Sequence, residues 1–222
     1  MSIEHTRPAD IERTSMAIIT KELEALGMSL PPEQLPVIKR VIHTTADFDY
    51  ARTLRFTPNA VRLGVAAMEG CTIVTDTNMA FSGVSKPTLE KLGGQALCYM
   101  AHPDVAQEAR ERGVTRATVS MEKALRDHPK AVLAVGNAPT ALLAIEALMD
   151  TGARPALVIG VPVGFVNVVE SKERILATCE RYQVPAIVAL GRKGGSNVAA
   201  AICNALLYSA ANALDPTARG WQ

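Results

Sequence analysis

Aromatic residues are scarce in this sequence, and neither sign of charge dominates it. Phe, Trp and Tyr make up 4% of the 222 residues, so an apolar core has to be built from Ala, Val, Ile and Leu. Hydrophobic residues reach 48% and charged residues 20%, a balance that excludes a disordered chain. This composition favours a buried parallel sheet covered by helices. The formal net charge of +1 offers no general field for a nucleic acid or an anionic membrane.

Long hydrophobic runs and paired cysteines are also missing. No apolar segment reaches the roughly 18 uninterrupted residues that span a membrane. The first ten residues, MSIEHTRPAD, are polar, so we expect no secretory signal. The four cysteines have no CxxC spacing, and no two histidines have metal-ligand spacing. We therefore predict free, mostly buried thiols, no bound metal and a soluble cytoplasmic protein.

Several catalytic and nucleotide-binding motifs are absent as well. The sequence has no GxSxG turn, no GxxxxGK[ST] phosphate loop and no GxGxxG after a predicted strand. Cys71 and Cys98 fall within predicted strands, where a thiol is inert. Nucleophilic hydrolysis and dinucleotide binding are therefore unsupported.

The hydrophobic pattern changes near Gly70. Before it, helical periodicity predicts helices from Pro8 to Leu26, from Glu33 to His43 and from Pro58 to Met68, with a short strand before the last of these. After it, short apolar runs alternate with helical segments, which indicates right-handed βαβ units and a parallel sheet. The predicted strands cover residues 71–75, 96–99, 131–135, 157–161 and 186–190.

These patterns predict one α/β domain over residues 1–222, with a mainly parallel sheet flanked by helices and a helical N-terminal portion. The helical portion covers residues 1–69, and the alternating β/α part covers residues 70–214. Residues 215–222 are expected to form a loosely attached tail.

Small and polar residues follow four of the predicted strands. They form the segments Thr75–Asn78, Gly136–Thr140, Pro162–Phe165 and Gly191–Ser196. In an open parallel sheet, ligands bind beyond the carboxyl ends of the strands. We therefore expect these segments to converge on one edge of the sheet and to form a wide cleft.

The segment GRKGGS, Gly191–Ser196, opens the last long helix. Its glycines let the backbone approach a ligand, N–H groups at a helix start attract anions, and Arg192 and Lys193 add positive charge. An anion site is one interpretation, and a tight turn with solvated cations is the other. The segment GNAPT, Gly136–Thr140, is likewise either a binding loop or only a helix start.

His43 is the strongest single candidate for chemistry. It is predicted at the end of a helix, beside Thr44 and Thr45, with Asp47 just beyond. An imidazole with an ordinary pKa of about 6.5 can both donate and accept a proton near neutrality. The residues alone do not distinguish an acid–base histidine from a structural one.

Five segments together resemble one known family. They are RVIHTTADFDYA (residues 40–51), TDTNMAFSGVSK (75–86), VGNAPTAL (135–142), GVPVGFVNVVESKE (160–173) and GRKGGSNVAAAICNAL (191–206). The set is similar to the precorrin-8X methylmutases, also called cobalt-precorrin-8 methylmutases, from about Ile11 to Leu206.

The resemblance implies an isomerase of cobalamin biosynthesis. Such an enzyme moves one methyl group of precorrin-8, or of its cobalt form, from C-11 to C-12 of the macrocycle and yields hydrogenobyrinate or cobyrinate. His43, in an Arg-x-x-His pattern that begins at Arg40, would protonate the ring system and promote a [1,5]-sigmatropic shift. The resemblance also implies a homodimer with the active site near the subunit interface and no added cofactor.

Expected substrate contacts follow from the resemblance and from the chemistry of the ring. The family's contacts fall on Ser15 and Arg40, and the strand-end segments would line the rest of the site. The flat apolar face of the ring suits Met79 and Phe165, whereas its carboxylate edge suits Arg40 and Arg192. The full set is Ser15, Arg40, Thr75, Asp76, Met79, Asn137, Ala138, Pro139, Thr140, Pro162, Val163, Gly164, Phe165, Arg192, Gly194, Gly195 and Ser196.

Two other functions remain open. A protein that carries a corrinoid without converting it would need the same cleft but would tolerate replacement of His43. A nucleotide-dependent transferase would hold phosphate at GRKGGS, although neither nucleotide fingerprint is present.

Overall fold

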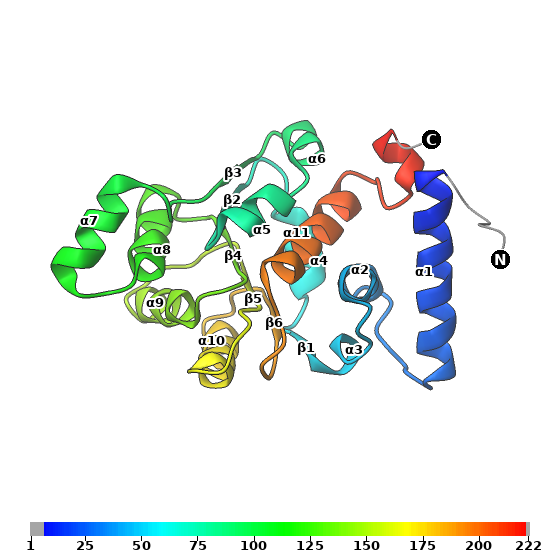
Figure 1. Cartoon of the computed structure of the whole chain (residues 1–222), viewed down its shortest axis with the longest axis horizontal. Helices are drawn as coiled ribbons and strands as arrows, with labels where there is room; N and C mark the ends of the chain where they lie inside the picture. Colours follow the sequence, from blue (N-terminus) through cyan, green and yellow to red (C-terminus); the bar gives the residue numbers. More distant parts are fainter. Residues whose placement is uncertain (1–6, 221–222) are drawn as a thin grey trace.

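A six-stranded sheet runs through the centre of the computed structural model, with helices on both of its faces (Figure 1). The structure describes residues 7–220, so the first six residues of the polar N-terminal stretch and the last two of the expected tail lie outside it. The strands are β1 Leu54–Phe56, β2 Thr72–Thr75, β3 Gln95–Leu97, β4 Val132–Val135, β5 Leu157–Gly160 and β6 Ala186–Ala189.

The strand order across the sheet is β1-β6-β5-β4-β2-β3. All neighbouring strands pair in parallel except β1, which pairs antiparallel with β6. This arrangement confirms the predicted α/β class with a mainly parallel sheet. The helices are α1 Pro8–Ala25, α2 Leu35–Thr45, α3 Tyr50–Thr53, α4 Ala60–Ala66, α5 Asn78–Gly83, α6 Lys86–Lys91, α7 Pro103–Arg112, α8 Arg116–Asp127, α9 Pro139–Asp150, α10 Val168–Arg181, α11 Ser196–Ala210 and the 3₁₀ helix η1 Pro216–Arg219.

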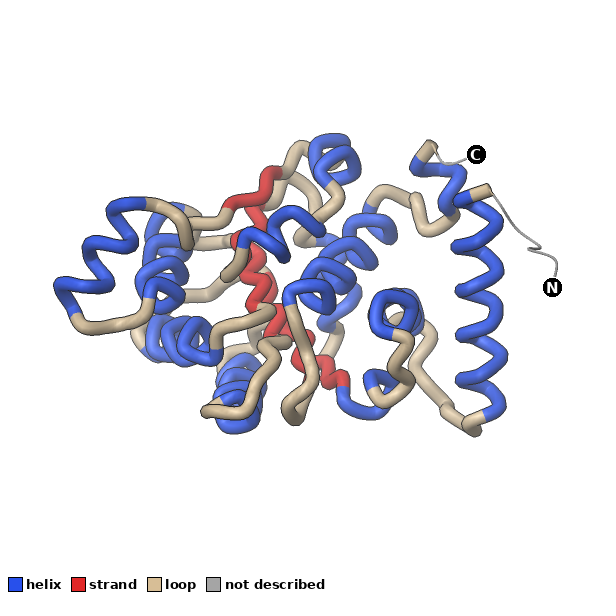
Figure 2. Tube along the Cα trace, viewed as in Figure 1, coloured by secondary structure: helices blue, strands red, loops and turns tan. Residues whose placement is uncertain are grey.

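Both faces of the sheet are buried, because alternate residues of each strand feed two separate apolar cores. On β4, Val132 and Ala134 pack with α2, α4 and α11, whereas Leu133 and Val135 pack with α8, α9 and α10. The strands therefore form a narrow band between two helical layers (Figure 2). The near absence of polar residues in these strands follows from this double burial.

The N-terminal helices extend one of the two layers. Helix α2 packs against α11 through a stripe made of Val37, Ile38, Val41 and Ile42, all of them buried. Helix α1 packs on α2 and η1 and is the outermost element on that side (Figure 1). Of the helices within residues 7–220, none has the length and apolar character that a membrane span requires.

Three details of the expected organisation are corrected by the structure. The short helices α3 and α5, of four and six residues, were not predicted. The apolar pattern predicts the last long helix from Ser196 to Leu214, but it ends at Ala210, because Asn212 adopts a left-handed backbone conformation with φ of 51°.

The expectation of a loosely attached tail is wrong for residues 215–220. Arg13 of α1 donates to both carboxylate oxygens of Asp215, at 3.1 and 2.9 Å. The side chain of Arg219, in η1, is only 6% exposed and donates to Glu12. Charged residues on α1 therefore hold the end of the described chain, and both ends lie on the same side of the molecule (Figure 1).

Candidate active site

Four parallel neighbours, β6, β5, β4 and β2, end at the same edge of the sheet. The segments that follow them are the four polar segments singled out in the sequence, so their convergence on one edge is confirmed. They also contact one another directly. Gly164 donates to the carbonyl of Arg192 at 3.2 Å, and the hydroxyls of Thr77 and Ser196 are 2.8 Å apart.

Asp76 organises the loop between β4 and α9. Its carboxylate is fully buried and accepts from the backbone N–H groups of Gly136, Asn137 and Ala138, at 2.8, 2.8 and 2.7 Å. Burial raises the pKa of Asp76, and the three N–H donors act in the opposite direction. These three hydrogen bonds hold the start of α9 in place without a bound ligand.

Four of the expected substrate contacts are buried in the structure. Thr75 and Asp76 are fully buried, and the Thr75 hydroxyl donates to the carbonyl of Thr77 at 3.0 Å. Pro162 and Gly195 are buried too, and the Gly195 N–H donates to Val161. These residues shape the edge of the sheet from within.

The other expected contacts at this edge are accessible. Met79, Val163 and Phe165 are 73%, 46% and 83% exposed, and the Arg192 guanidinium lies 5.4 Å from the centre of the Phe165 ring. Accessible or half-buried positions are Asn137, Ala138, Pro139, Thr140, Gly164, Arg192, Gly194 and Ser196.

Lys172 supports the GRKGGS loop and was missed from the sequence. It lies on α10 with its side chain fully buried, and its Nζ donates to the carbonyls of Gly191 and Lys193, both at 2.8 Å. Burial lowers the pKa of Lys172 to about 8. The signal was present in the spacing, because Lys172 shares the apolar stripe of Val168, Ile175 and Cys179.

The loop also contains a position that only glycine can occupy. A Cβ atom on Gly194 would lie 2.2 Å from the carbonyl oxygen of Val161, which is too close for two nonbonded atoms. A backbone carbonyl cannot move aside as the end of a flexible side chain can. The strand-end loops after β5 and β6 are therefore packed backbone against backbone.

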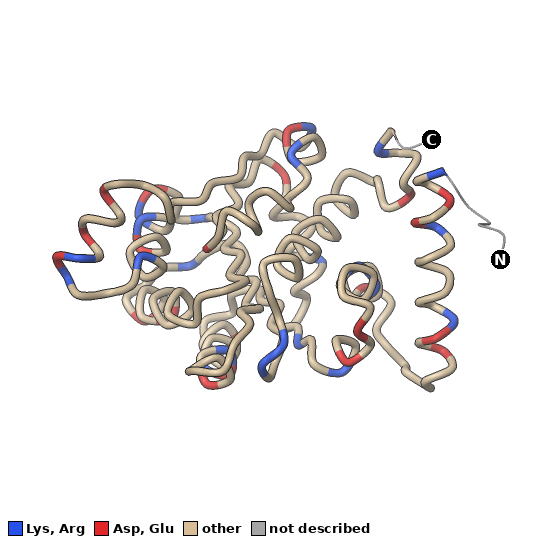
Figure 3. The backbone as a smooth tube through the Cα atoms, viewed as in Figure 1, with Lys and Arg blue, Asp and Glu red and all other residues tan. Residues whose placement is uncertain are grey.

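Lys193 links this loop to the segment after α2. Its ammonium lies 2.7 Å from carboxylate oxygens of both Asp47 and Asp49. The hydrogen bonds that Lys193 donates to those two carboxylates raise its pKa. Figure 3 shows this basic loop beside the acidic residues near α3. Two carboxylates already compensate the charge of Lys193, so its ammonium joins two segments of the chain and offers little charge to a ligand.

His43 lies in the last turn of α2, as the sequence predicts, and faces α1. It lines a cavity of about 230 Å³ with Ser15 and a second one of about 340 Å³ with Arg40 and Thr44. The structure thus brings Ser15, Arg40 and His43 together. Neither cavity is lined by a described residue of the four strand-end segments.

The imidazole of His43 is half-buried, and its Nδ1 is buried with no hydrogen-bond partner among the described residues. Burial lowers the pKa of His43, the charge of Arg40 lowers it further, and Glu12 acts in the opposite direction. A lowered pKa favours the neutral imidazole near pH 7, and a negative charge nearby would raise the pKa again.

Glu12 and Arg219, neither of them expected in the site, complete its charged part. The Glu12 carboxylate is buried and accepts from Arg40 at 2.7 Å and from Arg219 at 2.6 Å. Burial alone would raise the pKa of Glu12, but the hydrogen bonds from Arg219 and Arg40 outweigh burial and lower it. Glu12 lies in the buried stripe of α1, which is the signal that sequence reasoning could have used.

A mostly parallel sheet with polar loops at its carboxyl edge, and a half-buried histidine beside an arginine, are typical of an α/β enzyme. Among residues 7–220, no group of three or more His, Cys, Asp or Glu side chains could hold a metal ion. Residues 10–209 match the family model of precorrin-8X methylmutase (CbiC). The chain belongs to the precorrin-8X methylmutase family, a family of isomerases.

Individual relatives cover nearly the whole chain. The cobalt-precorrin-8 methylmutases of Salmonella typhimurium and Priestia megaterium are 44% and 42% identical to it, over 91% and 90% of this chain and 95% and 87% of theirs. The precorrin-8X methylmutase of Pseudomonas aeruginosa is 40% identical over 88% of this chain and 93% of its own. The crystal structure of the precorrin-8X methylmutase of Thermus thermophilus superposes with a TM-score of 0.81 at 38% identity, covering 91% of this chain and 98% of that one.

The buried amine of Lys172 predicts a pH-dependent stability. An unfolded lysine has a pKa of about 10.4, whereas burial depresses the folded value to about 8. Between these values the native state binds fewer protons, so its stability rises with pH, and this contribution is lost as pH falls through the folded pKa. We expect the unfolding free energy of wild type, relative to Lys172→Met, to increase by roughly 2–3 kcal/mol from about pH 7.5 to about pH 10.5. Urea unfolding at a series of pH values measures this difference, and a constant difference would contradict the buried amine.

Proposed function

We propose that this chain catalyses the isomerisation of precorrin-8 or cobalt-precorrin-8 in cobalamin biosynthesis. One methyl group would move from C-11 to C-12 of the macrocycle and give hydrogenobyrinate or cobyrinate. Membership of the family supports the reaction class. His43 lines two cavities, one with Ser15 and one with Arg40, and this arrangement supports an active site at His43. We also propose that residues 1–222 form one methylmutase domain, which the match of residues 10–209 to the family model supports.

The proposed role of His43 is to donate a proton to the ring system and to recover it after the shift. The methyl group leaves C-11 and bonds to C-12 within one molecule, so atoms and electrons balance without a co-reactant. Because the pKa of His43 is lowered in the free protein, an anionic neighbour would increase the fraction of imidazole that can act as an acid. The acetate and propionate carboxylates of the substrate supply that charge when they bind near Arg40.

The proposed binding mode separates the face of the ring from its edge. Met79, Val163 and Phe165 are exposed apolar side chains that suit the face. Arg40 and Arg192 suit the carboxylate edge, because guanidinium groups bind carboxylates in a planar fork. The carrier hypothesis uses the same contacts and differs only in needing no acid at His43.

Replacing His43 tests the catalytic role directly. Each protein is mixed anaerobically with precorrin-8, and separately with its cobalt complex, while the visible spectrum is recorded. We expect a new corrin band with wild type and with His102→Ala, an exposed histidine at the start of α7. The His43→Ala protein should bind the pigment but convert it at least about 100-fold more slowly, because general acid catalysis contributes that much. If wild type binds both pigments and changes neither, the carrier hypothesis replaces the isomerase.

The lowered pKa of His43 predicts the shape of the pH profile. For a general acid, kcat/KM falls as pH rises through the pKa of the free enzyme, which lies below the ordinary value of about 6.5. Bound carboxylates raise the pKa of the imidazole, so the inflection of kcat should lie at higher pH than that of kcat/KM. Steady-state rates over about pH 5–8.5 measure both inflections. A kcat/KM that rises with pH through this range would assign His43 the role of a base.

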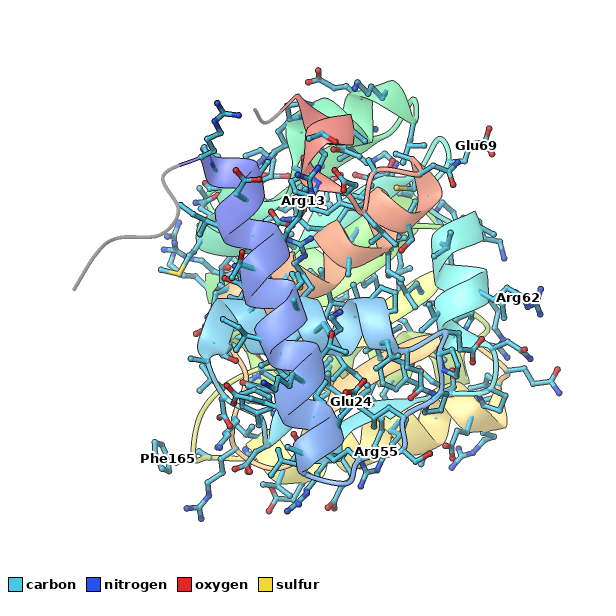
Figure 4. All side chains as sticks on the ribbon, turned by 90° about the vertical axis from the view of Figure 1, so that its right-hand side faces the viewer. Arg13, Glu24, Arg55, Arg62, Glu69 and Phe165 are labelled. Atoms are coloured by element: carbon cyan, nitrogen blue, oxygen red, sulfur yellow. The ribbon has the colours of Figure 1, made fainter. Side chains whose placement is uncertain are left out.

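We further propose a homodimer whose subunit interface lies near this site. Phe165 and Val166 in the loop after β5 are 83% and 75% exposed, and Phe165 points away from the body of the chain (Figure 4). An exposed apolar cluster of this kind is typical of an interaction surface. Sedimentation equilibrium should give twice the mass of one chain, and Phe165→Glu should shift it toward a monomer. The matched variant Leu26→Glu, at the exposed end of α1, should leave the dimer intact.

A reducing compartment fits the cysteines. All four are free, Cys71, Cys179 and Cys203 are buried, and Cys98 is half-buried. We therefore propose a cytoplasmic location, where thiols stay reduced.

A further inference from the structure

Three successive carbonyl groups of the loop after β6 accept hydrogen bonds from two other parts of the chain. The Nζ of Lys172 on α10 donates to the carbonyls of Gly191 and Lys193, both at 2.8 Å. Between them, the carbonyl of Arg192 accepts from the N–H of Gly164, in the loop after β5, at 3.2 Å. The backbone on both sides of Arg192 is therefore held by groups outside its own loop.

The loops after β5 and β6 are joined a second time, closer to the sheet. The N–H of Gly195 donates to the carbonyl of Val161 at 2.9 Å, and Gly194 packs against the same carbonyl with no room for a Cβ atom. The two loops thus form one unit. Lys172, whose side chain is fully buried, holds this unit from the protein interior.

An exposed arginine and an exposed phenylalanine lie together on this unit. The guanidinium carbon of Arg192 is 5.4 Å from the ring centre of Phe165. Phe165 directly follows Gly164, so the hydrogen bond that holds the carbonyl of Arg192 also holds the backbone next to Phe165. Within residues 7–220, Arg192 makes no ion pair, whereas the ammonium of Lys193 lies beside two carboxylates. Of the two cations of the loop, Arg192 is the one that can receive an anion.

We propose that Lys172 is a positioning residue for Arg192. It holds the backbone of Arg192 so that the guanidinium lies over the Phe165 ring before the substrate binds. The guanidinium is then in place for a ring carboxylate, while the Phe165 ring is in place for the apolar face of the macrocycle. This order lowers the entropy lost on binding, because the arginine does not have to be fixed at that moment. The inference rests on the proposed function, because it assigns the ligand as a macrocycle edged by carboxylates.

The variant Lys172→Met tests this role, because methionine keeps an unbranched apolar side chain and removes the donor. A contact made equally in the bound substrate and in the transition state affects KM and leaves kcat unchanged. We expect KM for precorrin-8 or its cobalt form to rise about fivefold, with kcat within about twofold of wild type.

The matched control is Cys179→Ala. Cys179 is also buried and lies about two turns further along the same face of α10. Its carbonyl accepts from the N–H of Val184, before β6, and therefore at the opposite end of that strand from the loop. We expect Cys179→Ala to leave KM unchanged even where it lowers stability. An unchanged KM in Lys172→Met would overturn the proposal, whether or not that variant is less stable.

A double-mutant cycle shows whether Lys172 acts through Arg192. Arg192→Gln alone should raise KM, because it removes the charge that receives the carboxylate. In the Arg192→Gln background, Lys172→Met should raise KM no further, since the residue that it positions is already lost. If the two increases in KM multiply, Lys172 acts independently of Arg192 and the proposal is wrong.

A ligand-free measurement separates this inference from the proposed function. Amide hydrogen exchange is followed by NMR, with each rate corrected for its intrinsic value. In wild type, the amide of Gly164 should exchange at least about tenfold more slowly than that of Phe165. Lys172→Met should remove this protection, and Cys179→Ala should retain it. If both amides exchange equally fast in wild type, the loops are not held together and the positioning role is overturned, even where Lys172→Met does not fold. A wild type that leaves both pigments unconverted would overturn only the proposed function.

Discussion

Burial of the sheet on both faces is the constraint on which the site depends. The loops that follow the central strands are partly buried, so their buried backbone polar groups need partners inside the protein. Asp76 accepts three N–H groups of the loop before α9, and Lys172 donates to two carbonyls of the loop before α11. One buried acid and one buried amine thus hold neighbouring loops from the protein interior. The accessible residues of those loops can then contact a ligand.

A second group of charged residues lies near His43, and its hydrogen bonds are arranged differently from those around Asp76. Around Asp76 each N–H has a partner, whereas around Glu12 two arginines compete for one carboxylate oxygen. Burial lowers the pKa of His43, the charge of Arg40 lowers it further, and Glu12 acts in the opposite direction. In the proposed reaction, carboxylates of the bound substrate would raise this pKa again and favour the protonated imidazole.

The two systems belong to different parts of the chain and are connected by Lys193. This lysine extends from the loop after β6 to the two aspartates that follow α2. Movement of this loop would therefore displace the segment that follows α2, the helix that carries His43. Exposed Phe165 and Val166 lie on the adjoining loop, so a second subunit seated there would be close to both systems.

The sequence by itself determined the fold class, the four strand-end segments and the position of His43 at the end of a helix. These features depend on local patterns, because apolar runs, helical periodicity and turn residues are read within a few neighbours. It also supplied the family, through segments that stay contiguous along the chain. The expected contacts of Thr75 and Asp76 show the limit of local patterns, because a polar residue at a strand end can face inward as readily as outward, and both of these are buried.

Only the tertiary structure decided which charges meet. Glu12, Arg40 and Arg219 are separated by 28 and 207 positions along the chain when counted from Glu12, and no local pattern joins them. The partners of Lys172 have a related cause, because the spacing along α10 indicates its burial but not the two carbonyls of a distant loop that accept from its amine. Burial, and with it the lowered pKa of His43, depends on packing among elements far apart in sequence, whereas the elements themselves follow from residues close together.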